Sequence, residues 1–209
     1  MDELLKTELV GIINEKRNKT LPEWTEAVVV CSEDISDSVF DIVDRKDSDL
    51  ESVKVAPNTG TATYYNHCDG NPYNLHFVRF EEFMNQFEGY TKNMGRADFV
   101  VCEPSKEYFI IHEISVGSIH SKLSKARTQL FNTLNLLYAS PVIKNFIDGF
   151  SHKLCYVTAM GGGAVDSPMD MTGGFNEIYR HLPDPIPFNA KQITNRGFLA
   201  LETRNVKLE

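Results

Sequence analysis

The sequence predicts an α/β protein in which a mixed central sheet is flanked by helices. The first observation is a pair of apolar runs, 98–102 and 108–115, joined by the polar segment EPSKE, a pattern typical of two strands and a turn. The second is the segment 121–138, where apolar residues recur at helical spacing. The third is the apolar run 152–160, which predicts a further strand after that helix.

Length and composition are compatible with one folded domain. The chain has 209 residues, 42% of them hydrophobic, and no linker-like segment divides it, so we expect a single domain over 1–209. No apolar run reaches the roughly 18 residues of a membrane span. The acidic, amphipathic N-terminus lacks the features of a secretory signal, and the four cysteines are scattered without a CxxC pattern. These features predict a cytoplasmic protein with reduced thiols and no membrane partner.

The other elements follow from apolar spacing and turn residues along the chain. Residues 2–19 predict an amphipathic helix, and Ala27–Cys31 predicts a buried strand. Residues 61–65 predict a strand within a segment rich in turn residues, and the tail segment 197–203 predicts an edge strand with alternating faces. The segment 78–95 predicts a helix that ends near Gly89 and whose apolar face consists of Phe80, Phe83, Met84 and Phe87.

The predicted hairpin brings two acidic residues together. If its turn is centred between Ser105 and Lys106, Asp98 lies directly opposite Glu113, with Cβ atoms about 5 Å apart. Two carboxylates this close repel each other unless a divalent cation or a proton lies between them. A slip of one residue would turn one of the side chains to the other face of the sheet, so this prediction depends on the turn. The hairpin therefore indicates a candidate metal site.

These residues resemble the PD-(D/E)xK nuclease superfamily, which has the restriction-endonuclease-like fold. That family places an Asp at the start of one strand and a Glu-x-Lys on the next, followed by a helix. The matching segments here are GRAD ending at Asp98 and the triplet that begins at Glu113. Ser115 occupies the position of the motif's Lys. The resemblance covers about 79–160 and implies a restriction-endonuclease-like core with elaborations at both ends.

The resemblance also implies roles for side chains outside the hairpin. Asp98 and Glu113 would hold Mg²⁺ or Mn²⁺, and Lys122 on the following helix would supply the amine that Ser115 cannot. Gln129 is similar to a helix Gln or Lys that many members carry, and it would orient the attacking water. Glu81, on the helix before the Asp strand, would add a metal contact, with Glu88 as the alternative. Each of these Lys and Glu residues is equally compatible with a solvated charge on a helix surface.

Two further patterns are weaker indications of a site. His67, Cys68 and Asp69 are all potential metal ligands, but adjacent side chains point in different directions, so we interpret them as a structural loop. Gly161–Gly163 follow a strand, as a phosphate-binding loop would, but the Lys-Ser/Thr of a P-loop is missing. We interpret this segment as a loop without a phosphate site.

The distribution of charge is compatible with a nucleic-acid partner although the total charge is −8. Residues 1–60 contain 14 acidic and 7 basic residues, a net charge of −7, whereas residues 91–130 contain 4 acidic and 6 basic residues, a net charge of +2. A bound cation would make the second segment more positive still. The total charge is unfavourable for indiscriminate binding to nucleic acid. The resemblance further implies a homodimer, because many relatives pair to cut two strands.

Three interpretations of the chain remain open at this point. The first is a metal-dependent nuclease that hydrolyses DNA or RNA. The second is a catalytically inactive, nuclease-like binding or structural module, since Ser115 in the Lys position is what a decayed site would contain. The third is an unrelated α/β domain in which Asp98 merely begins a strand and Glu113 pairs with Arg96 or Lys122.

Overall fold

The computed structural model describes most of the chain. The described residues are 1–43, 52–57, 59–66, 70–87, 89–90, 95–116, 119–160, 185–203 and 205–209, and the side chains of 115, 116, 119–122, 159 and 160 are not included. Within this part of the chain, no helix is both long and apolar enough to cross a membrane.

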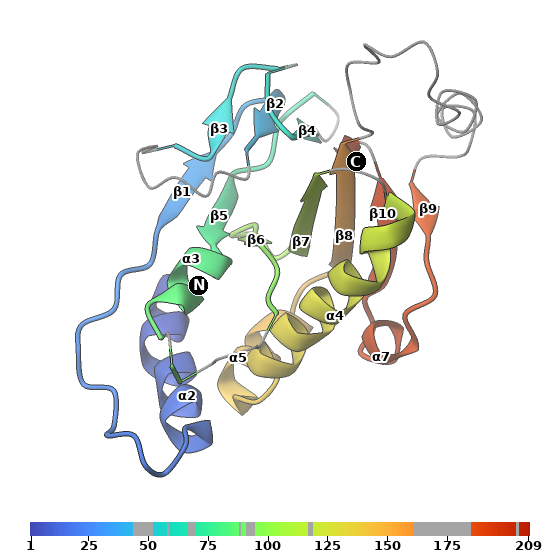
Figure 1. Cartoon of the computed structure of the whole chain (residues 1–209). Coiled ribbons are helices and arrows are strands. Elements are labelled where there is room, and N and C mark those ends of the chain that lie inside the picture. Colours follow the sequence, from blue (N-terminus) through green and yellow to red (C-terminus); the bar gives the residue numbers. More distant parts are fainter. Residues whose placement is uncertain are drawn as a thin grey trace.

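The main sheet has seven strands and mixed directions (Figure 1). Its first four neighbours run antiparallel to one another, whereas β7, β8 and β10 are parallel and β9 is antiparallel to β10. This arrangement confirms the predicted mixed central sheet of an α/β protein. In spatial order the strands are β1 (Ser32–Ile35), β5 (Leu75–Arg79), β6 (Phe99–Cys102), β7 (Tyr108–Val116), β8 (His152–Met160), β10 (Leu199–Thr203) and β9 (Ile186–Pro187).

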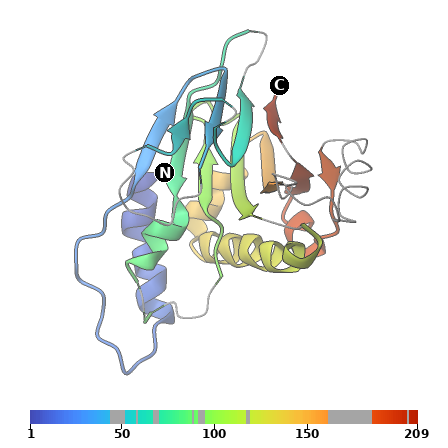
Figure 2. The ribbon, with the colours of Figure 1, turned by 45° about the horizontal axis from the view of Figure 1, so that its top comes forward.

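A second sheet of four short strands covers one face of the main sheet, and the sequence did not predict it. Strand β11 is parallel to β4, and the other two contacts are antiparallel. In Figures 1 and 2 the strands β2, β3 and β4 gather beyond one end of β5. In spatial order the four strands are β11 (Asn205–Leu208), β4 (Ala62–Asn66), β2 (Val39–Ile42) and β3 (Lys54–Val55).

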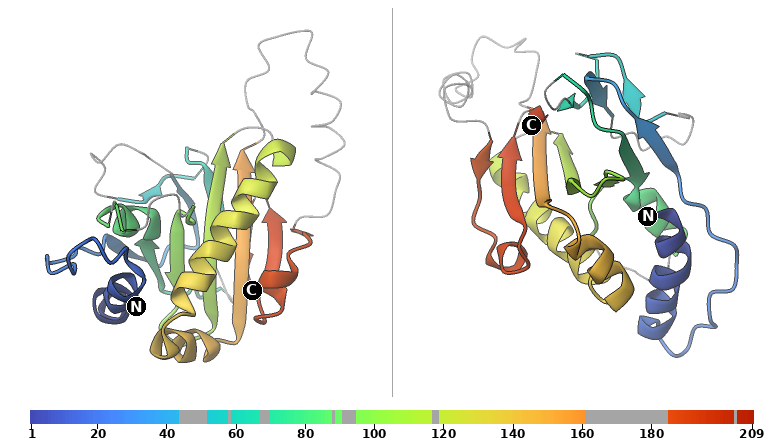
Figure 3. Two further views of the ribbon diagram at one scale, coloured as in Figure 1. Left: turned by 60° about the horizontal axis from the view of Figure 1, so that its bottom comes forward. Right: turned by 180° about the vertical axis from the view of Figure 1, so that it is seen from behind.

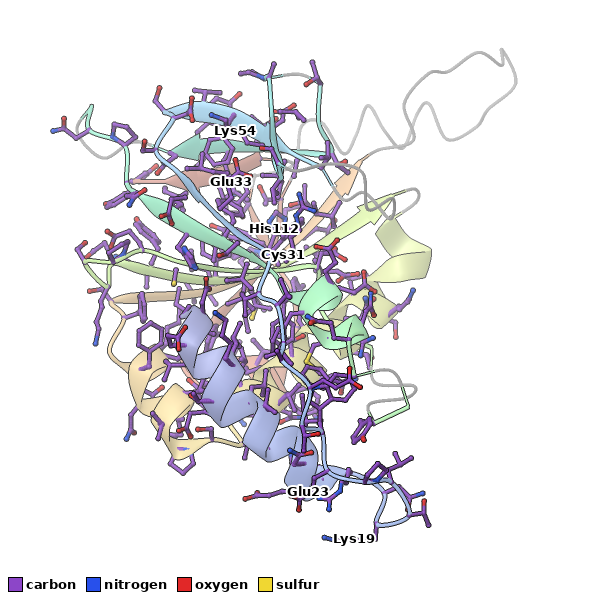
Figure 4. The ribbon with its side chains drawn as sticks, turned by 90° about the vertical axis from the view of Figure 1, so that its left-hand side faces the viewer. Lys19, Glu23, Cys31, Glu33, Lys54 and His112 are labelled. Carbon is purple, nitrogen blue, oxygen red and sulfur yellow. The ribbon has the colours of Figure 1, made fainter. Side chains whose placement is uncertain are left out.

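Helices cover the opposite face of the main sheet, so the molecule has three layers, which Figure 4 shows one above another. The longest helix, α4, lies across β7 and β8 (Figure 3). The N-terminal helical segment runs without a break through α1 (Asp2–Leu4), the π-helical turn η1 (Leu5–Leu9) and α2 (Val10–Lys16). The remaining helices are α3 (Phe80–Asn85), α4 (Ile119–Leu137), α5 (Pro141–Asp148) and α7 (Lys191–Thr194).

The helices form where apolar residues recur at helical spacing. In α4, one buried stripe at intervals of three or four residues packs onto the sheet. The predicted face of α3 is completely buried, which confirms that prediction. Helix α5 begins after Ser140, whose side chain accepts a hydrogen bond from the Ile143 amide, and Pro141 occupies its first turn. The buried residues of α4 are Ala126, Leu130, Leu134 and Leu137.

Three predictions about local structure were wrong. Ala27–Cys31 is extended but belongs to neither sheet, and Val29 is 62% exposed. The Gln86 side chain both donates to the Val29 carbonyl and accepts from its amide, so a side-chain amide takes the place of a neighbouring strand. The first helix ends at Lys16 rather than at residue 19. The tail strand β10 is not at an edge, because β9 pairs with it on the outer side.

Candidate carboxylate site

The β6–β7 hairpin has the predicted register. The pairs run from Phe99–His112 to Cys102–Phe109, so the next pair along the ladder is Asp98 opposite Glu113. The turn is compact because Lys106 adopts a left-handed conformation (φ 67°) and its amide donates to the Glu103 carbonyl at 3.0 Å. The centre of the turn therefore lies where the sequence placed it.

Both carboxylates lie on the helix-covered face of the main sheet. Val100 and Ile111, each two residues away along its strand, belong to the core between that face and the helices. Asp98 is 7% exposed and Glu113 is 6% exposed. One oxygen of Asp98 (Oδ2) accepts the Ile114 amide at 2.6 Å, which fixes the carboxyl group beside the Glu113–Ile114 peptide. Two acidic side chains are therefore buried side by side, an arrangement that is costly when both are ionised.

Helix α3 begins at the same edge of the sheet. The Asp98 carbonyl accepts hydrogen bonds from the amides of Phe80 at 2.8 Å and Glu81 at 3.3 Å, so the first turn of α3 is bonded directly to the residue that begins β6. Glu81 is half-buried in that turn. The structure thus places the backbone of Glu81 next to Asp98. The role of Glu81 as a metal ligand stays a prediction.

Helix α4 is attached to the segment that leads into Asp98. Gln129, which is 7% exposed, donates from Nε2 to the Arg96 carbonyl at 2.9 Å, and the Thr133 hydroxyl accepts the Ala97 amide at 2.8 Å. A Cβ atom at Gly95 would lie 3.1 Å from the Gln129 side chain, so the glycine permits this close approach. The second polar atom of the amide, Oε1, is buried and has no hydrogen-bond partner among the described residues. Gln129 therefore brings an unsatisfied carbonyl oxygen next to the strand that begins at Asp98.

The amine of the predicted site lies outside the described side chains. Lys122 belongs to α4, seven residues or roughly 10 Å before Gln129 along the helix axis. Ser115 lies on β7 opposite Ala159 of β8. The side chains of both residues are not described, so their contacts remain predictions. Three other predictions fall outside the described residues, namely those on Glu88, on His67 with Cys68 and Asp69, and on Gly161–Gly163.

The carboxylate pair does not belong to a larger cluster of metal ligands in the described part of the chain. Among those residues, no group of three or more His, Cys, Asp or Glu side chains is arranged so that it could hold a metal ion. The protein therefore offers two buried carboxylates and a nearby amide oxygen. Water and a substrate phosphate would have to complete the coordination of any cation.

A buried polar chain next to the site was missed by the sequence reasoning. His112 is completely buried on the other face of β7, between the two sheets (labelled in Figure 4). Its Nδ1 lies 2.7 Å from the Tyr64 hydroxyl of β4, and its Nε2 lies 2.5 Å from the Thr158 hydroxyl of β8. Burial lowers the pKa of His112 to about 3. A polar residue inside an apolar strand was the available signal, but the partner on β4 could not be read from local spacing.

A cavity lies at the opposite end of β6, away from the carboxylate pair. Its volume is about 420 Å³, and its lining includes Asp2, Asp34 and His76. The two nitrogens of His76 lie 2.8 Å from Asp2 and 2.7 Å from Asp34. Burial alone would raise the pKa of Asp2, but hydrogen bonds from Ser32 and His76 lower it overall. These contacts fasten the first helical turn to the sheet edge, and we assign them a structural role.

Comparisons with known proteins add no evidence on the function of this site. No protein-family model, no curated protein and no solved structure matches the chain. The chemistry of the carboxylate pair must therefore be inferred from its own geometry.

Proposed function

We propose that the protein is a metal-dependent nuclease that hydrolyses phosphodiester bonds of DNA or RNA, with Asp98 and Glu113 as the ligands of Mg²⁺ or Mn²⁺. The observation that carries this proposal is the register of the hairpin, which buries these two carboxyl groups side by side on one face of the sheet. Carboxylate oxygens are the ligands that hard divalent cations prefer. A cation between the two groups would turn a costly arrangement into a favourable one.

The order of elements around the pair supports a restriction-endonuclease-like core. The antiparallel strands β5, β6 and β7 follow one another, α4 comes next, and β8 returns parallel to β7. Helix α3 precedes β6, Asp98 immediately precedes the first residue of β6, and Glu113 lies on β7. The segment 79–160 thus has the element order that the nuclease interpretation requires.

The residues present fit a magnesium ion. Mg²⁺ is usually held by one or two carboxylates, keeps several waters and is completed by substrate phosphate, so a two-carboxylate site is sufficient. The buried Oε1 of Gln129, which lacks a hydrogen-bond partner among the described residues, is a further oxygen that a metal-bound water could satisfy. When bound, such a cation lowers the pKa of a coordinated water and stabilises charge on the phosphate.

The chain's own residues would hold and orient the reacting groups. The Ile114 amide fixes one oxygen of Asp98 and so orients the carboxyl group that would contact the cation. The bond from Gln129 to the Arg96 carbonyl fixes the amide so that its oxygen can orient a water. Lys122 would polarise that water or the phosphate, because Ser115 has no positive charge to offer.

The second candidate function is a nuclease-like module without catalytic activity, which binds a partner or serves a structural role. Ser115 in the position of the motif's Lys favours it. This alternative keeps the hairpin and the fold, but it predicts weak or absent cation binding and no cleavage.

Cleavage assays with a matched pair of variants would test the proposal. Single-stranded and double-stranded DNA and RNA would be incubated with wild-type protein and Mn²⁺, then with Asp98→Asn and with Glu103→Gln. Glu103 is a control because it is also a buried carboxylate of the same hairpin, at 6% exposure, but it lies at the turn. We expect cleavage by the wild type and the control, and none by Asp98→Asn. Equal cleavage by all three proteins, or none by the wild type, would contradict the nuclease proposal.

A further inference from the structure

The polar chain Tyr64–His112–Thr158 connects three strands and both sheets behind the carboxylate pair. Tyr64 lies on β4 of the second sheet, His112 on β7 and Thr158 on β8, and all three are at most 1% exposed. The Tyr64 ring is stacked on Phe40 and meets Phe77 edge to face, so packing holds the hydroxyl in place. The imidazole is thus bonded on both sides by side chains that have little freedom to move.

A neutral imidazole can make both hydrogen bonds, one to the Tyr64 hydroxyl and one to the Thr158 hydroxyl. It carries one N–H donor and one nitrogen acceptor, and each hydroxyl can donate or accept, so either tautomer completes both hydrogen bonds. Burial disfavours the charged form of His112, in agreement with its lowered pKa. The two hydroxyls therefore occupy both ring nitrogens of His112.

Because His112 is next to Glu113 in sequence, the hydrogen bonds that hold its imidazole also affect the carboxylate site. His112 immediately precedes Glu113, and successive side chains of a strand point to opposite faces, so the imidazole anchors β7 from behind. The residue that follows, Ile114, donates its amide to Asp98 on the front face. Hydrogen bonds thus hold both neighbours of Glu113 in the strand. His112 is bonded by Tyr64 and Thr158 on one face of the sheet, and Ile114 is bonded by Asp98 on the other.

We propose that His112, held by Tyr64 and Thr158, is a positioning residue that sets the place of the Glu113 carboxyl relative to Asp98. The inference rests on the proposed function, because it assigns the second sheet a role in the same cation site. Groups that orient metal ligands typically change metal affinity by about 10- to 100-fold when they are removed. Tyr64 is the group to remove, since it belongs to the second sheet and lies on the far side of β7 from the carboxylates.

Two Tyr→Phe variants separate positioning from general stability. Tyr64→Phe removes the hydroxyl next to His112 but keeps the ring. Tyr108→Phe is the matched control: Tyr108 is also buried on β7 on the same face, and its hydroxyl donates to the Glu209 carbonyl at 2.5 Å. Tyr64→Phe loses its hydrogen bond to His112, whereas Tyr108→Phe loses two, because the Tyr108 hydroxyl also accepts from the Glu209 amide at 3.2 Å. The control is therefore at least as disruptive a change. Tyr108, however, lies five residues from Glu113, at the turn end of the strand.

Two measurements on these variants would be made. Calorimetric titration gives the affinity for Mn²⁺, and amide hydrogen exchange in cation-free protein gives the protection of Ile114 relative to Ile110 of the same strand. We expect Tyr64→Phe to weaken Mn²⁺ binding about tenfold and to speed the relative exchange of Ile114 by a roughly similar factor. Tyr108→Phe should change neither quantity.

The outcomes distinguish this inference from the proposed function. If the wild type binds Mn²⁺ but Tyr64→Phe matches Tyr108→Phe in both measurements, the positioning role is wrong and the carboxylate site stands. If the wild type does not bind Mn²⁺, the proposed function fails. The rate of amide hydrogen exchange at Ile114, which is measured without a cation, then decides alone whether the hydrogen bonds of His112 hold the backbone next to Glu113.

Discussion

The two ends of the β6–β7 hairpin contain carboxylates of nearly equal burial but with different surroundings. At the turn, Glu103 is 6% exposed and accepts hydrogen bonds from the Ser105 amide at 2.9 Å, the Ser105 hydroxyl at 2.6 Å and the Glu107 amide at 3.1 Å. At the other end, Asp98 and Glu113 are buried to a similar extent and face each other. Burial of a carboxylate is therefore not itself a mark of a site.

What differs between the two ends is the group opposite each charge. The donors around Glu103 replace the water that it loses on folding, so its ionised form is well accommodated. At the open end, Asp98 accepts the Ile114 amide and lies opposite a second carboxylate, Glu113. The proposed cation would lie between these two carboxylates, whereas donors of the chain itself surround Glu103.

The largest expected effect is the loss of activity when the open end loses a carboxylate. Glu113→Ala should reduce Mn²⁺-dependent cleavage by about 100-fold or more, because a cation contributes several kcal/mol of transition-state stabilisation. The circular dichroism spectrum should stay that of the wild type. Wild-type rates of cleavage from this variant would make the two ends of the hairpin equivalent and refute the assignment.

The next effect concerns Lys122, the amine proposed to act beside Asp98 and Glu113. Lys122→Ala should lower cleavage by roughly 100-fold, the usual contribution of a positioned proton-transfer or polarising group. Adding Ser115→Lys should restore part of that loss, because the motif position then carries the amine. Lys125→Ala, an exposed residue of the same helix, is the control. If Lys122→Ala cleaves at the wild-type rate, Lys122 is only a surface charge.

Replacing a carboxylate by an amide should change the free energy of unfolding in opposite directions at the two ends of the hairpin. Glu103→Gln should lower the free energy of unfolding by about 2 kcal/mol, since it weakens hydrogen bonds to a charged acceptor. Glu113→Gln should raise it by about 1 kcal/mol in cation-free protein, because it removes repulsion from Asp98. Urea unfolding in the presence of EDTA measures both changes. A loss of stability in both variants would show that Glu113 is held as Glu103 is.

The effect farthest from the carboxylates is the contribution of His112 to the stability of the protein in acid. Its pKa is lowered from 6.5 to about 3 by burial, so between these pH values the unfolded chain binds a proton that the folded chain does not. Its stabilising contribution is present above pH 6.5 and is lost as the pH falls toward 3, at up to about 1.4 kcal/mol per pH unit.

Urea unfolding between pH 3.5 and 7.5 would measure this dependence. We expect His112→Phe to be less stable at neutral pH, because Tyr64 and Thr158 lose their partner, but to have a shallower slope in acid than the wild type. Identical slopes would mean that His112 becomes protonated in the folded protein, and the claim that its buried imidazole stays neutral would then be wrong.

Local patterns were sufficient to predict the register that places Asp98 opposite Glu113. The register follows from the position of EPSKE between two apolar strands, and side-chain alternation then places Asp98 and Glu113 on one face. The apolar stripe of α4 predicted which side packs on the sheet, which brings Gln129 next to the Asp98 strand. These features depend only on neighbours within a few residues in sequence or across one short turn.

The features that the sequence did not predict depend on distant contacts. The second sheet pairs 62–66 with 205–208, and its strand β3 has only two residues, so no local alternation marks it. The contact between Tyr64 and His112 follows from that sheet and could not be predicted without it. Ala27–Cys31 has a strong strand pattern but belongs to neither sheet, because its backbone is bonded by the side chain of Gln86, just after α3, and by the Arg79 amide at the end of β5.

The most direct test of the central claim is a calorimetric titration of Mn²⁺ into the wild type and into Asp98→Ala. We expect micromolar binding by the wild type and much weaker binding by the variant, since the variant loses one of the two proposed protein ligands. Binding of equal strength by both proteins would place the cation elsewhere. No binding by either protein would leave the buried pair of carboxylates without the ligand proposed for it and would contradict the account.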